Sequence, residues 1–365
     1  MEENTKSENV KRKALKEICK ISTGKLNANA KVENGEYPFF TCQKVPNKIN
    51  KYSFNTEAVL MAGNGNVGNV HYYSGKFDAY QRTYVIESSE VNVKFLYYYL
   101  KTFFKGYIEN YKKEGIISYI TLPVLEKFLV PLPPLKKQEK IAAVLDKFTE
   151  LTEELTEELT AREAQYEYYR NMLLSQEWIE KEEGKEVEWK ALEEVIEYEQ
   201  PTKYIVSSKK YNDKFSAPVL TAGQSFILGY TDESEGIYNA STEKPVVIFD
   251  DFTTSNHWID FDFKVKSSAL KILKAKDSVI SLKYCYYYMQ TILFDISEHR
   301  RKWISQYSKI KIPFPSLETQ QKIVKILDNF ETLVNDIRQG LPKEIELRQK
   351  QYEYYRKKLL TFEEK

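Results

Sequence analysis

The amino-acid sequence predicts an α+β protein: two mixed α/β globular domains in a tandem pseudo-repeat, with two long helices that form an antiparallel coiled coil. Three observations lead to this architecture. The chain has 365 residues, enough for two domains of ordinary size. Segments 130–148 and 312–330 have closely similar sequences. A heptad pattern of apolar residues follows each of these segments.

The composition is typical of a folded protein in water. Apolar residues make up 42% of the chain and charged residues 29%, so each half has enough apolar side chains for a core. No apolar run reaches the ~20 residues that cross a membrane, and residues 1–13 are polar, so we expect a soluble, cytoplasmic protein with no membrane partner. The 3 cysteines and 3 histidines are scattered without a CxxC pair, which predicts neither a zinc site nor a disulfide framework.

Charge is unevenly distributed along the chain, although the formal net charge is only +1. Residues 1–130 carry 19 Lys or Arg against 13 Asp or Glu, whereas residues 131–188 carry 8 against 15. An acidic stretch therefore cancels a basic segment, and the balance of the whole chain does not exclude a nucleic-acid partner.

An internal repeat divides the chain into two half-molecules. VPLPPLKKQEKIAAVLDKF (130–148) matches IPFPSLETQQKIVKILDNF (312–330), and QYEYYRNMLL (165–174) matches QYEYYRKKLL (351–360). A period of about 180 residues is too long for a solenoid and predicts a tandem duplication. The predicted parts are a first globular domain (1–130), an elbow and first helix (131–178), a charged linker (179–187), a second globular domain (188–312), and an elbow and second helix (313–365).

Each globular domain is predicted to mix strands with helices. EAVLMAG (57–63), TYVIE (83–87) and KPVVIFD (244–250) have the β-branched and apolar residues typical of buried strands. VNVKFLYYYLKTFFK (91–105) and SLKYCYYYMQTILFDI (281–296) are predicted helices with aromatic core residues. Consecutive tyrosines on a helix face different directions, so we assign both tyrosine triples to packing rather than to base stacking.

The heptad pattern predicts the two long helices. Apolar residues recur in alternating steps of four and three, and two such seams most simply bury each other, running antiparallel as a two-fold-related duplication requires. The alternative is that each seam packs on its own globular domain. Gly340 and Pro342 predict a break in the second helix, with Pro342 opening a new segment. The predicted seam residues are Ile141, Leu145, Phe148, Leu155, Leu159, Tyr166, Tyr169, Leu173, Ile323, Leu327, Phe330, Val334, Ile337, Leu341, Tyr352, Tyr355 and Leu359.

The segment GNGNVG (63–68) has the glycine spacing of a dinucleotide-binding motif, and Glu87 follows at about the distance of a ribose-binding acid. That motif requires a helix to begin at its third glycine. The residues after Gly68 have no helical period, so we interpret the segment as a turn whose glycines allow close approach of the backbone to a partner.

A second pattern has the order of acids and lysine found in metal-dependent nucleases. Asp250 and Asp251 precede Asp262 and Lys264, and two carboxylates can hold Mg²⁺ while a lysine assists the attacking water. The first half has no counterpart, so we favour carboxylates that brace a polar loop. A self-contained Mg²⁺-dependent endonuclease that uses Asp250, Asp262 and Lys264 stays as the alternative. No P-loop and no nucleophile–histidine pairing is visible, so the sequence predicts no catalytic centre and no bound metal.

Polar and basic residues typical of nucleic-acid interfaces cluster once in each half. Arg and Lys contact phosphates or guanine edges, while Asn and Gln pair with adenine in the major groove. The predicted DNA contacts are Asn64, Asn66, Asn69, Lys76, Gln81 and Arg82 in the first half, and Thr253, Thr254, Asn256, His257, Lys266, Arg300, Arg301 and Lys302 in the second.

This duplicated plan resembles the specificity subunit of type I restriction–modification systems. The resemblance rests on the two elbows, on QYEYYR followed by a leucine pair, on GKLNANAKVENGEYPFFTC (24–42) with AGNGNVG and YQRTYVI, and on PVLTAGQSFILGYT (218–231) with residues 248–273. It covers nearly the whole chain. The two helices are unequal and only the second has the glycine–proline break, which departs from a symmetric plan.

The resemblance implies a non-enzymatic, sequence-specific DNA-recognition subunit. Two target-recognition domains would read the two halves of a bipartite, asymmetric site in double-stranded DNA. The coiled coil would set their spacing and dock two methyltransferase subunits, and restriction/translocase subunits would join them. No cofactor is expected on this chain, because S-adenosylmethionine, ATP and Mg²⁺ would belong to the partner subunits. A coiled-coil scaffold without DNA contact is the remaining alternative.

Overall fold

The computed structural model describes residues 10–109, 119–222, 226–295, 300–335 and 340–362. The chain forms two compact units: unit 1 comprises residues 1–157 and 344–365, and unit 2 comprises residues 158–343. Helix α4 (Leu135–Leu173) contributes its first part to unit 1 and its second part to unit 2. Each unit therefore combines a globular domain with the helical segments that pack on it, whereas the predicted boundaries separate globular domains from helices.

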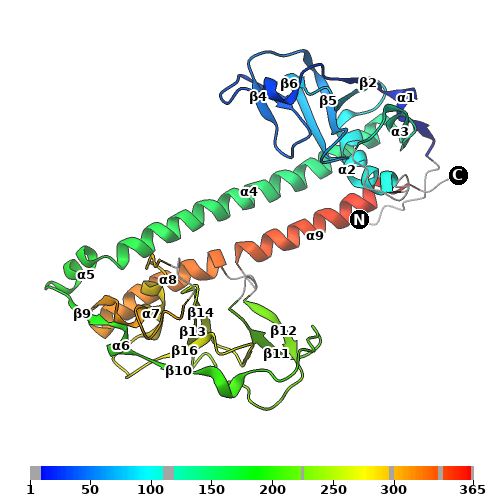
Figure 1. The fold of residues 1–365 in the computed structure, drawn as a ribbon. Helices are drawn as coiled ribbons and strands as arrows, with labels where there is room; N and C mark the ends of the chain where they lie inside the picture. The colour runs from blue at the N-terminus through cyan, green and yellow to red at the C-terminus, as the bar shows by residue number, and fades with distance from the viewer. Residues whose placement is uncertain (1–9, 110–118, 223–225, 296–299, 336–339, 363–365) are drawn as a thin grey trace. The chain divides into compact units, whose positions relative to one another are not determined.

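Unit 1 is built on a six-stranded sheet with the order β2-β7-β5-β6-β3-β4 (Figure 1). Its strands pair antiparallel except for the parallel pair β3–β6. Apolar residues of β5 and β7 pack with those of helix α2 in one core. The elements are β1 (Arg12–Ala14), α1 (Leu15–Ile18), β2 (Lys20–Thr23), β3 (Tyr37–Phe40), β4 (Asn47–Ile49), β5 (Phe54–Ala62), β6 (Val70–Ala79), β7 (Thr83–Glu87), α2 (Val93–Glu109), α3 (Leu122–Glu126) and β8 (Leu129–Pro131).

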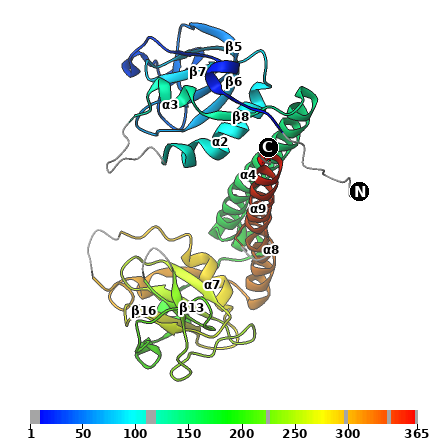
Figure 2. The same cartoon turned by 90° about the vertical axis from the view of Figure 1, so that its right-hand side faces the viewer.

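Unit 2 repeats this strand order in two pieces, β10-β16-β13-β14 and β15-β11-β12 (Figure 1). The neighbouring strands β13 and β16 of the larger piece are also labelled in Figure 2. The single strand β6 of unit 1 corresponds to the separate strands β14 and β15, which is why one sheet becomes two. The elements are α5 (Gln176–Glu183), β9 (Glu188–Ala191), α6 (Leu192–Val195), β10 (Ile196–Glu199), β11 (Ala217–Leu220), β12 (Ile227–Thr231), β13 (Val246–Asp250), β14 (Asn256–Ile259), β15 (Lys264–Val265), β16 (Leu270–Ala275), α7 (Leu282–Met289), β17 (Lys311–Phe314) and α8 (Leu317–Asn335).

The hydrogen-bond register relates the two units residue by residue. The turn after β5 closes with a bond from Ala62 N to Asn69 O of 2.9 Å, and the turn after β13 closes with a bond from Asp250 N to Ser255 O of 2.9 Å. Ala62 thus corresponds to Asp250 and Asn69 to Ser255. The predicted tandem pseudo-repeat of mixed α/β domains is confirmed.

The predicted helical seam is confirmed within each unit. In unit 1, Phe148 of α4 stacks on Tyr355 of α9 (Leu341–Leu360), with ring centroids 5.5 Å apart. In unit 2, Tyr169 of α4 stacks on Phe330 of α8 at 5.2 Å. The predicted break is also present, since α8 ends at Asn335 and α9 begins at Leu341. The buried seam residues are Ile141, Leu145, Tyr166, Leu173, Ile323, Leu327, Val334 and Leu341. The half-buried ones are Phe148, Leu155, Leu159, Tyr169, Phe330, Tyr352, Tyr355 and Leu359, while Ile337 lies outside the described residues.

Two elements of unit 2 differ from the sequence prediction. The segment predicted as a charged linker begins inside α5, a helix capped by Ser175 and ended by Gly184 at φ 68°, with Ile179 fully buried. Helix α7 ends at Met289, well before the predicted residue 296. The chain leaves the helix there, and Phe294 packs instead on the ring of Tyr307 at 5.3 Å.

A polar network fastens each globular domain to its long helix. In unit 1, Asp146 of α4 pairs with Lys94 at 2.6 Å and accepts a hydrogen bond from the Tyr98 hydroxyl at 2.8 Å. In unit 2, Glu331 of α8 pairs with Lys283 at 2.7 Å and accepts from the Tyr287 hydroxyl at 2.8 Å. Burial, the largest cause, raises the pKa of both tyrosines, so both stay protonated donors. Each domain is thereby held at a fixed place on its helix.

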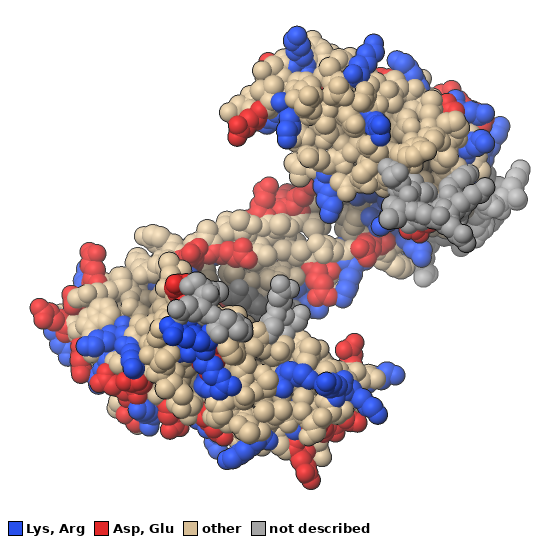
Figure 3. Space-filling view, viewed as in Figure 1, with Lys and Arg blue, Asp and Glu red and all other residues tan. Residues whose placement is uncertain are grey.

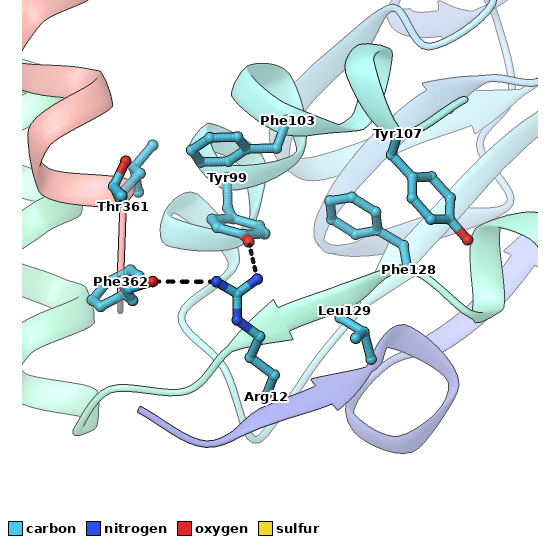
Figure 4. Close-up of a pocket in the computed structure, with 9 residues that line it drawn as sticks. Arg12, Tyr99, Phe103, Tyr107, Phe128, Leu129, Thr361 and Phe362 are labelled. Carbon is cyan, nitrogen blue, oxygen red and sulfur yellow. Dashed lines mark hydrogen bonds between the residues drawn. The ribbon is translucent and has the colours of Figure 1, made fainter. Parts of the chain in front are cut away.

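A pocket of ≈ 410 Å³ lies in unit 1 where β1, α2, β8 and the end of α9 meet (Figure 4). The Arg12 guanidinium donates to the Tyr99 hydroxyl at 3.5 Å and to the Phe362 carbonyl oxygen at 3.3 Å. Phe103 and Phe128 form part of the aromatic wall. Arg12 therefore ties residues from the beginning and end of the described chain into one unit.

Candidate nucleic-acid interface

The glycine-rich segment of unit 1 is a tight turn between β5 and β6. Gly65 and Gly68 have φ of 63° and 79°, in the left-handed region that favours glycine. Gly63 N donates to Arg82 O at 2.8 Å, and a Cβ at Gly63 would lie only 2.6 Å from that oxygen. No helix begins at Gly68, so the interpretation as a turn is confirmed and the dinucleotide motif is absent.

The three asparagines of this turn face the neighbouring β3–β4 turn. Asn64 Oδ1 accepts from the Cys42 thiol at 2.7 Å, and Asn66 Nδ2 donates to Cys42 O at 3.0 Å. Asn69 Nδ2 donates to Gln43 O at 3.3 Å and lies 2.9 Å from His71 Nε2. These amides brace the two turns against each other, so their geometry is that of positioning residues.

The basic residues predicted with these asparagines are placed differently from one another. Arg82 and Gln81 are exposed beside the turn, and Gln81 Nε2 donates to Asn27 Oδ1 at 2.9 Å. Lys76 lies opposite Asn55 near the start of β5, roughly 26 Å along the strand from Gly63, at ~3.3 Å per residue. Arg82 and Gln81 join the turn in one surface, and Lys76 does not.

The corresponding tip of unit 2 is shorter and strained. Thr253 Oγ1 donates to Asp250 Oδ2 at 2.7 Å, and Thr254 N donates to Asp250 O at 2.9 Å. Thr254 has a φ of 61°, where a β-branched side chain costs roughly 1–3 kcal/mol. The matching bond in unit 1 runs from Gly68 N to Ala62 O, so threonine stands where the other unit has glycine.

A pair of histidines occupies equivalent places beside the two tips. His71 lies opposite Leu60 in the β5–β6 pair, and His257 lies opposite Ile248 in the β13–β14 pair. His257 stacks on Phe226 with ring centroids 3.8 Å apart. Burial lowers the pKa of both histidines. His257 is among the predicted DNA contacts and His71 is not, because the residues around them are not repeated and only the strand register relates the two positions.

The remaining predicted residues of unit 2 divide into surface and interior. Asn256 is half-buried on β14, next to His257. The Lys266 ammonium donates to the Tyr211 hydroxyl at 3.1 Å, and the exposed Arg301 donates to Ser268 Oγ at 3.1 Å. Arg300 is also exposed.

Lys302 departs from the prediction. Its side chain is only 2% exposed, with the ammonium 5.9 Å from the centre of the Phe294 ring. Such a side chain packs in the domain interior and does not reach a phosphate, so we remove Lys302 from the candidate interface.

The acids of the nuclease-like pattern are used inside the fold. Asp251 accepts from Trp303 N at 2.8 Å and pairs with Lys271 at 3.1 Å, both side chains being 1% exposed. Lys264 is buried and pairs instead with Glu233 at 3.1 Å. The exposed Asp262 accepts from Asn239. Lys264 therefore does not join the acids, and Asp250 and Asp251 brace the loops around the tip of unit 2.

The described part of the chain offers no metal site and no membrane-spanning helix. Among these residues, no group of three His, Cys, Asp or Glu side chains is arranged to hold a metal ion. None of the described helices is both long enough and apolar enough to span a membrane.

One face of the globular part of unit 1 is mainly basic. In the view of Figure 3, most of the charged side chains on that face are Lys or Arg. Lys31, Lys44 and Lys48 are exposed around the β3–β4 turn, close to the glycine-rich turn. Positive charge next to a rigid polar tip suits a polyanion such as a nucleic-acid backbone.

Comparison with known proteins identifies the family. The model of the type I restriction modification DNA specificity domain matches residues 7–162 and 184–347. A type I restriction enzyme specificity subunit of Escherichia coli is 52% identical over 192 residues, which cover 50% of this chain and 46% of that protein. A putative type I restriction enzyme specificity subunit of Haemophilus influenzae is 30% identical over 360 residues, covering 90% of this chain and 89% of the relative.

Solved structures agree in fold. The crystal structure of a type I restriction-modification system S subunit from M. genitalium has a TM-score of 0.75 at 16% identity and covers 100% of this chain and 99% of that one. Since the family model matches once in each half, and the Haemophilus relative matches along nearly the whole length, the chain belongs to the family of type I restriction–modification specificity subunits.

Proposed function

We propose that this chain is the DNA-recognition subunit of a type I restriction–modification complex and reads a bipartite, asymmetric target. One observation carries the proposal: the two units repeat one scaffold and differ at its tip. Six residues separate Ala62 from Asn69 in unit 1, whereas four separate Asp250 from Ser255 in unit 2. Equal scaffolds would present the same element to two stretches of duplex, and unequal tips would read different bases.

The proposed assembly assigns chemistry to partners and recognition to this chain. The paired helices would keep the two readers at a fixed separation and dock two methyltransferase subunits, which restriction/translocase subunits would join in the cytoplasm. S-adenosylmethionine, ATP and Mg²⁺ would be held by those partners, and this chain would be non-catalytic. The internal use of Asp251 and Lys264 supports this division over the endonuclease alternative.

The test is reconstitution with a methyltransferase partner and sequencing of the methylated sites in randomised duplex DNA. We expect two short specific blocks separated by unspecified bases, and no methyl transfer or cleavage by the isolated chain. Binding of the isolated chain to duplex should weaken linearly with the logarithm of salt concentration. A single specific block, or catalytic activity of the rigorously purified chain, would contradict the proposal. If the chain bound no duplex DNA at any salt concentration, the alternative of a coiled-coil scaffold without DNA contact would be favoured.

A further inference from the structure

The β3–β4 turn of unit 1 borders a hollow of ≈ 380 Å³ next to the glycine-rich turn. Thr41, Gln43, Asn47 and Asn66 are among the residues that line it. Sequence reasoning assigned the amides of the glycine-rich turn to DNA and passed over those of the β3–β4 turn. The hydrogen bonds reverse these roles, because Asn64, Asn66 and Asn69 are engaged in holding the turns together.

Gln43 has an exposed side-chain amide, and hydrogen bonds that run from Thr41 through Asn47 set its orientation. Thr41 is 6% exposed, and its hydroxyl oxygen accepts from Asn47 Nδ2 at 3.1 Å. The same Asn47 Nδ2 donates to Gln43 Oε1 at 3.1 Å. A buried hydroxyl thus fixes Asn47, and Asn47 fixes which edge of the Gln43 amide carries the oxygen.

The backbone of Gln43 is held as firmly as its side chain. Gln43 N donates to Thr41 Oγ1 at 3.4 Å, and Gln43 O accepts from Asn69 Nδ2 at 3.3 Å. A free glutamine side chain loses rotamer entropy when it is ordered. In this protein the hydrogen bonds order Gln43 before any ligand binds. Gln43 therefore loses less side-chain entropy on forming a hydrogen bond to a ligand than an unrestrained surface side chain does.

The groups that Gln43 presents define the ligand. An amide oxygen has two lone pairs, of which Asn47 occupies one, and no described residue accepts a hydrogen bond from Gln43 Nε2. An acceptor beside a donor, in one plane, matches the N6 amino group and N7 of adenine in the major groove. The exposed Lys31 and Lys44 flank the turn and supply positive charge for the adjoining phosphates.

We infer that Gln43 is a specificity-determining residue of unit 1, that it reads an adenine in one block of the target, and that Asn47 and Thr41 position it. This rests on the proposed function and adds the base class and the reader. Asn64, Asn66 and Asn69 hold the turn that supports Gln43.

The test sequences the sites methylated by complexes rebuilt with each variant, on a randomised duplex library. Gln43→Ala should lose roughly 5- to 150-fold of discrimination for adenine at one position of one block and leave the other block unchanged. Gln43→Glu should shift that position toward cytosine, whose N4 amino group donates to a carboxylate. Gln349→Ala, an exposed glutamine on α9 of the same unit, is the matched control and should change no position.

A second variant separates orientation from contact. Asn47→Asp replaces an amide that donates to Thr41 and Gln43 by a carboxylate that can only accept. The Thr41 hydroxyl would then donate to the carboxylate, and so would Gln43 Nε2, which turns the Gln43 amide over and exchanges its donor and acceptor edges. The preference for adenine at the same position should fall, while the melting temperature of the chain stays within about 2 °C of wild type because the substitution is at the surface. Unchanged discrimination in Gln43→Ala, or a lost preference for a base other than adenine, would overturn the inference. Absence of any specific block in the wild-type complex would instead refute the proposed function.

Discussion

Replacing Asp251 by alanine should destabilise unit 2 severely, because its carboxylate is a buried structural charge. The side chain is 1% exposed and pairs with Lys271, which is equally buried, at 3.1 Å. It also accepts from Trp303 N at 2.8 Å and from Lys302 N at 3.0 Å. Lys302 N keeps a second acceptor, the Asp251 carbonyl oxygen at 2.9 Å, so truncation leaves Trp303 N and the Lys271 ammonium as the groups that lose a partner.

The size of the effect follows from these partners. Removing one member of a buried ion pair costs about 3–5 kcal/mol, since the remaining charge stays in the interior without compensation. Lys271 retains a hydrogen bond to Gln200 Oε1 at 2.5 Å, which favours the lower part of that range. For a domain of about 150–250 residues, each kcal/mol lowers the melting temperature by about 2–4 °C, so we expect a fall of about 6–15 °C. Asp251→Asn keeps an acceptor for the backbone donors and should cost less than the alanine variant.

Tryptophan fluorescence is a selective assay for this effect. All 4 tryptophans of the chain, including Trp303 next to Asp251, lie in residues 158–343 of unit 2. Thermal and urea unfolding followed by fluorescence therefore report on unit 2 alone. Asp262→Ala is the control, because Asp262 is exposed and bonds only to Asn239 among the contacts described, so its loss should change stability by about 0.5 kcal/mol or less.

The result that refutes this reasoning is a loss below about 1 kcal/mol in Asp251→Ala. If that variant stayed folded while a DNA-cleaving activity of the wild-type complex disappeared, the carboxylate would be acting on a metal or a nucleophile. The endonuclease alternative would then need to be reopened.

Three further predictions concern spacing, reading and pH. Four residues inserted after Leu155 add ~6 Å to α4 and nearly preserve the seam, so sequencing of methylated sites should show a gap longer by about one or two base pairs, with both blocks unchanged. An unchanged gap in an active complex would show that the helices do not set the gap length. Arg82→Ala should relax only one block and Arg301→Ala only the other, and equal effects on both blocks in the same assay would exclude separate readers. Because burial lowers the pKa of His71 and His257 below the unfolded value of 6.5, their contribution to stability is present above pH 6.5 and is lost as the pH falls below 6.5. Replacing both by glutamine should therefore weaken the dependence of the melting temperature on pH between pH 7 and 5, and an unchanged dependence would contradict this prediction.

The fold was largely predictable because the strand and heptad patterns of the sequence agree with the packing of these segments in the folded protein. The run of β-branched and aromatic residues at 83–87 forms a strand with the predicted limits, and the heptad seam places its apolar residues in the helix contacts. The predicted new helical segment is also present, since α9 begins at Leu341 with Pro342 in its first turn. Helix α7 was predicted too long because apolar periodicity continues past Met289, where aromatic packing on Tyr307 prevails.

The candidate interface was only partly predictable because reading surfaces depend on which side chains are already engaged. Asn64 and Gln43 are both amides in polar turns, and only the structure shows that the first braces a turn while the second is exposed and oriented. Lys302 follows two exposed arginines in sequence and yet lies in the interior. A pattern of residue types identifies the neighbourhood of a binding surface, and the hydrogen bonds decide which members of it remain available.

The contact of Arg12 with Phe362 has a consequence for how the protein is made. Unit 1 draws on residues 1–157 and on residues 344–365, whereas unit 2 is one continuous stretch between them. At about 5–20 residues per second, a ribosome needs roughly 10–40 s to synthesise the intervening stretch. During that interval the first globular domain lacks its α9 partner, with the apolar side chains of α4 around Phe148 awaiting it. Of the two units, unit 1 is therefore begun first and completed last. The apolar surface of its α4 segment is the surface that a chaperone would have to protect during synthesis.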